Sequence, residues 1–131
     1  MNRVGIDLAA VADIEDSLAS FGTRFTDRVF TPAEVADCAG DPRRLAARWA
    51  AKEAVIKALR LGPDDAAPPR EIEVVGGAHG PEVRLHGGLA ERARRAGWHR
   101  VEVSLTHTDC HAAAVVLAEL DEAGAPHSRT D

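Results

Sequence analysis

Hydrophobic and polar residues follow two periods along this 131-residue chain, one typical of strands and one typical of helices. Within 100–106, Val101, Val103 and Leu105 alternate with polar residues, which predicts a strand with one buried face. After residue 8, apolar residues recur every three or four positions, which predicts a helix. The whole pattern predicts strands over 2–8, 71–75, 82–86, 100–106 and 112–119. It also predicts a helix that ends near residue 20, a short helix that begins near residue 31, and two further helices over 43–61 and 88–96.

Capping and turn residues separate these elements. Thr31-Pro32-Ala33-Glu34 is a capping box with proline at the first helical position, so a short helix should begin there. The central helix should end near Gly62-Pro63. The segment Gly76–Pro81 is rich in glycine but no helix follows it, which favours a hairpin turn over a phosphate-binding loop. The predicted fold is α+β: a small antiparallel sheet packed on a long central helix. It forms one domain over residues 1–120, with a flexible C-terminal tail at 121–131.

Composition and charge exclude several classes of protein. Hydrophobic residues make up 45% of the chain and charged residues 28%, which is ordinary for a globular domain. A net charge of -5 argues against a general binder of nucleic acid or of anionic membranes. No apolar run is long enough to span a bilayer, and no secretory signal opens the sequence. Cys38 and Cys110 form no disulfide framework, so we expect a cytoplasmic protein.

The segment Arg48–Leu59 is the most informative part of the chain. It sets Lys52, Glu53 and Lys57 among alanines and large apolar residues, with no clearly polar helix face. A buried charge is costly unless a partner or a metal compensates it, so we expect Glu53 to have one. The alternative is an exposed ion pair between Glu53 and Lys57, one helical turn apart.

A second carboxylate, Asp7, follows Gly5-Ile6 at the end of the first predicted strand. Two carboxylates on adjacent elements, with lysines beside them, can hold a divalent cation against a phosphorylated ligand. Asp7 could instead cap the helix that follows the strand.

The turn 107–111 also carries groups that bind metals. His107, Asp109, Cys110 and His111 are possible zinc ligands, but four side chains of so short a turn cannot easily converge on one tetrahedral ion. We therefore interpret most of them as turn residues and keep His107, at the strand end, as a ligand-facing candidate. The arginines at 43, 44 and 48 could line the path of an anionic ligand or could be surface charge.

Together these residues resemble the holo-acyl-carrier-protein synthase family, the small single-domain branch of the 4′-phosphopantetheinyl transferases. The resemblance spans residues 4 to about 119, and its pieces occur in the order of the family. The matching pieces are Gly5-Ile6-Asp7, Arg24-Phe25, Arg28-Val29-Phe30-Thr31 with Glu34, Arg48-Trp49-Ala50-Ala51-Lys52-Glu53, Lys57-Ala58-Leu59, Ile72-Glu73-Val74, and Val103-Ser104-Leu105 with His107.

The resemblance implies transfer of the phosphopantetheine arm of coenzyme A to a serine of an apo acyl carrier protein of fatty acid or polyketide biosynthesis, with release of 3′,5′-ADP. It implies that Asp7 and Glu53 hold Mg²⁺ on the pyrophosphate, and that Lys57 contacts the phosphates. We place Asp7, Glu53 and Lys57 in the catalytic set, and Arg48, Lys52, Lys57 and His107 in the set that binds coenzyme A. Arg48 and His107 would lie at the nucleotide end. The base that takes the serine proton is open between Glu53 and a water on the metal. The resemblance further implies a homotrimer with active sites between subunits.

Three positions depart from the family pattern. Asp13 stands where an arginine that pairs with the acidic carrier helix is expected, Ala10 replaces a frequent glutamate, and Thr106 replaces serine. Asp13 would repel an acidic carrier, so we expect a non-standard carrier or a docking surface built from Arg24 and Arg28. Two other functions stay open: a non-catalytic member that binds coenzyme A or carriers on a biosynthetic assembly line, and a metal-dependent hydrolase that uses His107 and His111.

Overall fold

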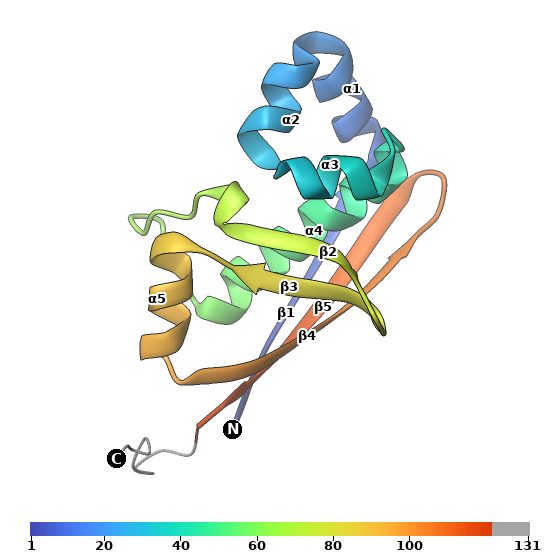
Figure 1. The fold of residues 1–131 in the computed structure, drawn as a ribbon. Coiled ribbons are helices and arrows are strands. Elements are labelled where there is room, and N and C mark those ends of the chain that lie inside the picture. Colours follow the sequence, from blue (N-terminus) through green and yellow to red (C-terminus); the bar gives the residue numbers. More distant parts are fainter. Residues whose placement is uncertain (122–131) are drawn as a thin grey trace.

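The computed structural model describes residues 1–121 and has two antiparallel sheets packed around one long helix (Figure 1). The larger sheet has the strand order β1-β5-β4, and the smaller is the hairpin β2-β3. Figure 1 shows α1, α2 and α3 gathered at one end of the molecule, with α5 at the other. The elements in chain order are β1 Asn2–Ala10, α1 Val11–Phe21, α2 Thr23–Val29, α3 Pro32–Cys38, α4 Pro42–Leu59, the 3₁₀ turn η1 Pro69–Glu71, β2 Ile72–Gly77, β3 Gly80–Leu85, α5 Gly87–Arg95, β4 Trp98–His107 and β5 His111–Leu120.

Helix α4 is the centre of the fold. Asp41 caps the first turn of α4 by accepting a hydrogen bond from the Arg43 N–H. The helix ends at Leu59, and the C-cap residue Arg60 adopts a left-handed conformation. Six of its ten buried residues are alanines. Since alanine side chains are short, neighbouring elements can approach the backbone of α4 closely. The structure therefore buries this helix on almost every side, as its lack of a polar face predicted.

Strand β1 packs directly on α4 because Gly5 has no side chain. A Cβ atom at residue 5 would lie 1.8 Å from the carbonyl oxygen of Ala54, which is far inside van der Waals contact. Successive strand residues face opposite sides of a sheet, so Asp7 lies on the same face of β1 as Gly5. This close approach brings Asp7 to the helix that carries Glu53.

The opposite face of the β1-β5-β4 sheet exposes apolar side chains. The register pairs Val4 with Leu117 and Ile6 with Val115. Val4, Ile6 and Leu8 remain 64–66% exposed, although their neighbours in β1 face α4. An apolar patch of this kind on a sheet commonly marks an interaction surface.

The predicted α+β class is confirmed, and so are the capping box at Thr31 and the β2-β3 hairpin. The single predicted sheet is wrong in detail, because the hairpin forms a sheet of its own. Sequence reasoning missed the seven-residue helix α2, which Gly22 separates from α1. Of the predicted tail 121–131, only Asp121 lies within the described residues, and its N–H donates to the carbonyl of Gly97. Within residues 1–121, no helix combines the length and apolar character that crossing a bilayer requires.

Candidate active site

Asp7 lies within β1 and points towards α4. Its Oδ1 accepts a hydrogen bond from Lys57 Nζ at 3.1 Å, and the same ammonium donates to the carbonyl of Ile6 at 3.0 Å. The side chain of Asp7 is 18% exposed and that of Lys57 is 56% exposed. The capping alternative for Asp7 is wrong, because the N-cap of α1 is Ala10. The alternative prediction of an exposed ion pair between Glu53 and Lys57 is also wrong, because Lys57 pairs with Asp7 instead.

Glu53 is partly buried on α4, one turn before Lys57. Burial raises the pKa of its carboxyl group, the negative charge of Asp7 raises it further, and Lys57 partly offsets both effects. The two carboxylates therefore lie close enough to repel each other, and one lysine does not neutralise both. A cation between them would relieve this repulsion.

The donor set at Asp7 and Glu53 suits Mg²⁺. Magnesium is commonly bound by one or two carboxylates, with substrate phosphates and water as its other ligands. Within residues 1–121, no group of three or more histidine, cysteine or acidic side chains is placed to hold a metal. Structural zinc sites need such a group, and among the described residues the side chains of the 107–111 turn do not form one. Asp109 of that turn instead pairs with Arg43 at 3.1 Å.

Arg48 lies on α4 five residues before Glu53, and therefore about 140° round the helix from it. Its Nε is buried, and among the described residues it is the one buried side-chain nitrogen or oxygen without a hydrogen-bond partner. Arg48 and Arg44 line a depression in the surface together with Asp37 and Leu105. Two guanidinium groups against one carboxylate give this depression a net positive charge, which suits an anion.

His107 is the last residue of β4 and is exposed. It lies two positions after Leu105, and therefore on the same face of the strand. Since Leu105 lines the depression that contains Arg48, His107 and Arg48 lie on the same side of the molecule. The structure thus brings Asp7, Glu53 and Lys57 together, whereas Arg48 and His107 lie on the side of the molecule where Leu105 lines the separate depression.

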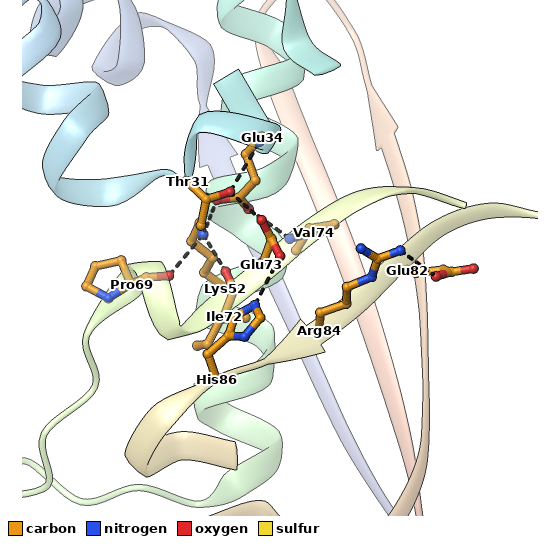
Figure 2. Close-up of polar contacts among 10 residues, drawn as sticks. All are labelled: Thr31, Glu34, Lys52, Pro69, Ile72, Glu73, Val74, Glu82, Arg84 and His86. Carbon is orange, nitrogen blue, oxygen red and sulfur yellow. Dashed lines mark hydrogen bonds and ion pairs between the residues drawn. The ribbon is translucent and has the colours of Figure 1, made fainter. Parts of the chain in front are cut away.

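Lys52, the remaining predicted residue, has a different environment. Its side chain is 1% exposed, and its ammonium pairs with Glu34 and donates to the carbonyls of Pro69 and Ile72 (Figure 2). All three of its protons are in use, so we leave Lys52 out of the ligand-contacting set. Sequence reasoning identified Glu34 as a capping residue but did not identify it as the partner of Lys52.

Asp7, Glu53 and Lys57 form one charged group on this α+β scaffold, and Arg48 lines a separate depression in the surface. The sequence profile of the 4′-phosphopantetheinyl transferase superfamily matches residues 3–116 of this chain. The chain belongs to this superfamily.

Named relatives and solved structures agree with this assignment. The chain is 46% identical over 130 residues to a holo-[acyl-carrier-protein] synthase of Chloroflexus aurantiacus, covering 87% of this chain and 95% of the relative. The acyl carrier protein synthase structure from Mycobacterium tuberculosis matches with a TM-score of 0.72 and 41% identity, covering 91% of this chain and 97% of the other. The Helicobacter pylori holo-[acyl-carrier-protein] synthase in complex with coenzyme A matches with a TM-score of 0.79 and 26% identity, covering 88% and 99%.

Proposed function

We propose that this protein transfers the 4′-phosphopantetheine group of coenzyme A to a serine of an apo acyl carrier protein and releases 3′,5′-ADP. One observation carries the proposal: Asp7 lies against the helix that carries Glu53, and Lys57 of the same helix bonds to Asp7 at 3.1 Å. The relatives are named for this activity, and one of the similar structures holds coenzyme A.

Each residue of the site has a distinct task. Asp7 and Glu53 would hold Mg²⁺, which neutralises charge on the pyrophosphate and so assists phosphoryl transfer. Lys57 orients Asp7 through their ion pair, and its exposed ammonium would also contact the phosphates. Arg48 and His107 would bind the nucleotide end, where the guanidinium group of Arg48 would supply charged donors. Glu53 and a water on the metal are the two candidates for the base that takes the serine proton.

We further propose that the protein is a homotrimer in the cytoplasm. The exposed apolar face of β1 and β5 supports self-association, because a patch of this kind is costly in water. The cytoplasmic location is supported by Cys38 and Cys110, which are both free thiols.

Substituting Ile6 by lysine is expected to separate the subunits. Ile6 is 65% exposed and lies at the centre of the apolar patch, so the change should not disturb the core of the subunit. Three charges brought together at a desolvated interface would oppose assembly. Sedimentation velocity should show trimers for the wild type and monomers for Ile6→Lys. A trimer of unchanged stability in the variant would show that this face is not the interface.

Carrier docking is proposed at the end of the molecule that holds α1 and α2. Arg24 and Arg28 line a surface depression between these helices together with the exposed Phe21. Asp13 is exposed on α1 and adds negative charge close by. We therefore propose a carrier that is less acidic than usual, or one that docks mainly on the two arginines.

Replacing Asp13 by arginine is expected to improve the use of a conventional acidic carrier. The change removes a repulsive charge and adds an attractive one, so kcat/KM for that carrier should rise about tenfold at low salt. The gain should shrink as ionic strength rises, because screening weakens exposed charges. Steady-state assays over a salt series measure this, with Glu91→Arg on α5 as a control for net charge. An equal gain in the control, or none in Asp13→Arg, would contradict a docking role for residue 13.

Intact mass spectrometry tests the proposed transfer. Several apo carriers are incubated with the protein, coenzyme A and Mg²⁺, and one carrier is expected to gain the mass of phosphopantetheine. If a known transferase modifies every carrier and this protein modifies none, the chain is instead a binding member of the superfamily.

A further inference from the structure

A buried ion pair lies one residue away from Glu53. Lys52 Nζ is 2.8 Å from Glu34 Oε1, and both side chains are withdrawn from solvent, at 1% and 0% exposure (Figure 2). Lys52 adjoins Glu53 in α4, whereas Glu34 lies in α3. The pair is separate from the groups that face the proposed ligand.

Lys52 uses every proton of its ammonium group. Besides Glu34, it donates to the carbonyl of Pro69 at 2.9 Å and to the carbonyl of Ile72. These carbonyls belong to η1 and to the first residue of β2. One side chain therefore fixes α4 to three other elements.

Glu34 is satisfied just as completely. Its Oε1 also accepts from the N–H of Thr31 at 2.9 Å, and its Oε2 accepts from the N–H of Val74 at 2.8 Å. The Thr31 hydroxyl donates to Glu73, which is also hydrogen-bonded to His86. Figure 2 shows these groups joined in one network between α3, α4 and β2. The carboxylate of Glu34 therefore cannot shift without breaking backbone contacts in two elements.

Stability alone does not explain this pair. Buried ion pairs contribute little net stability, because desolvation offsets their attraction, and apolar replacements are often neutral. Orientation is a different matter. Large interlocking side chains help to fix the rotation of a helix, and six of the ten buried residues of α4 are alanines, which interlock little. The three directional bonds of Lys52 supply the rotational register that alanines do not.

We propose that Lys52 and Glu34 are positioning residues for the active site, because they fix the rotation of α4 that points Glu53 at Asp7. Neighbouring residues of a helix are held about 100° apart, so fixing Lys52 also fixes Glu53. The expected effect on the rate of transfer rests on the proposed function. The expected position of Glu53, set by Lys52 and Glu34, does not.

The test is the double variant Lys52→Met/Glu34→Gln, which removes both charges and leaves no buried charge unpaired. Glutamine keeps an acceptor for a backbone N–H, which favours folding. Loss of groups that orient a metal ligand typically weakens metal binding about 10- to 100-fold. We therefore expect the affinity for Mn²⁺ in the presence of coenzyme A to fall by about 10- to 100-fold in the double variant. Electron paramagnetic resonance measures this affinity. We expect kcat to fall at least about tenfold, while KM for coenzyme A at saturating metal stays within about twofold.

Leu89→Ala is the matched control, because Leu89 is buried on α5 and the change loosens the core without touching the pair. This control should lose thermal stability but keep the wild-type kcat and Mn²⁺ affinity. Wild-type kcat and Mn²⁺ affinity in the double variant would overturn the proposal. A crystal structure of the double variant gives a readout independent of function, and stays decisive even if the wild type transfers nothing. Glu53 should have moved away from Asp7, and an unchanged position would overturn the proposal.

Discussion

Replacing Glu53 by alanine is expected to lower kcat/KM for phosphopantetheine transfer about a thousandfold, the effect of several kcal/mol of lost charge stabilisation. The change removes one of the two carboxylates that would hold Mg²⁺, and it also removes a candidate base. The remaining carboxylate, Asp7, is already paired with Lys57. Initial rates from quenched reactions analysed by mass spectrometry measure the loss. Glu91→Ala, an exposed position on α5, is the control and should retain the wild-type rate.

Thermal unfolding separates this role from damage to the fold. The pKa of Glu53 is raised in the folded state, so its charged form opposes folding once the pH exceeds the unfolded value of about 4.3. Without metal, Glu53→Gln should therefore unfold at a slightly higher temperature than the wild type at neutral pH, and at a similar one below pH 4. With Mg²⁺ and coenzyme A the order should reverse, because the bound ligands stabilise the wild type more strongly. A variant that is less stable without metal would contradict the account of Glu53.

Gly5→Ala is expected to cost about 3 kcal/mol or more in the free energy of unfolding, the upper range for an added core methyl group. The new Cβ would overlap the Ala54 carbonyl oxygen, which cannot move without distorting α4. Strand β1 must then shift away from the helix and carry Asp7 with it. Transfer activity should fall even at temperatures where the variant remains folded. Denaturant unfolding and initial rates measure the two effects.

Gly88→Ala provides the matched glycine control. Residue 88 lies in helix α5, and the nearest atom to an added Cβ is a Glu71 carboxylate oxygen at 3.8 Å, an ordinary contact. Alanine is a better helix former than glycine, so this variant should be equally stable or more stable by up to about 1 kcal/mol. Equal losses in Gly5→Ala and Gly88→Ala would contradict the close approach of β1 to α4.

The parts of the site that follow from the sequence are those set by local chemistry. Asp7 and Glu53 could be identified from the sequence because each carboxylate stands in a short stretch of small and apolar residues, which predicts its burial. Asp7 follows Gly5-Ile6, and Glu53 lies among alanines one turn before Lys57. The seven-residue helix α2 was missed because so short a helix carries little periodic signal. Lys52 was misplaced for a different reason. Its partners Glu34, Pro69 and Ile72 are 17–20 residues away along the chain, and only the tertiary fold shows that they surround its ammonium group.

The exposed apolar face also could not be predicted from the sequence pattern. Val4, Ile6 and Leu8 alternate with Gly5 and Asp7, and nothing local says which set faces the core. The structure turns the small and polar set inward, because only glycine permits contact with the backbone of α4. The larger apolar residues are left at the surface, where a second subunit could cover them.

The central claim is that Asp7 and Glu53 together hold a divalent cation against coenzyme A. The most direct test is a crystal structure with coenzyme A and Mn²⁺, in which anomalous scattering locates the metal. The account predicts one strong peak between the carboxylates of Asp7 and Glu53, beside the pyrophosphate, and its absence from Glu53→Ala crystals. A metal bound at His107 and His111 instead, or a pyrophosphate far from Asp7, would contradict the account.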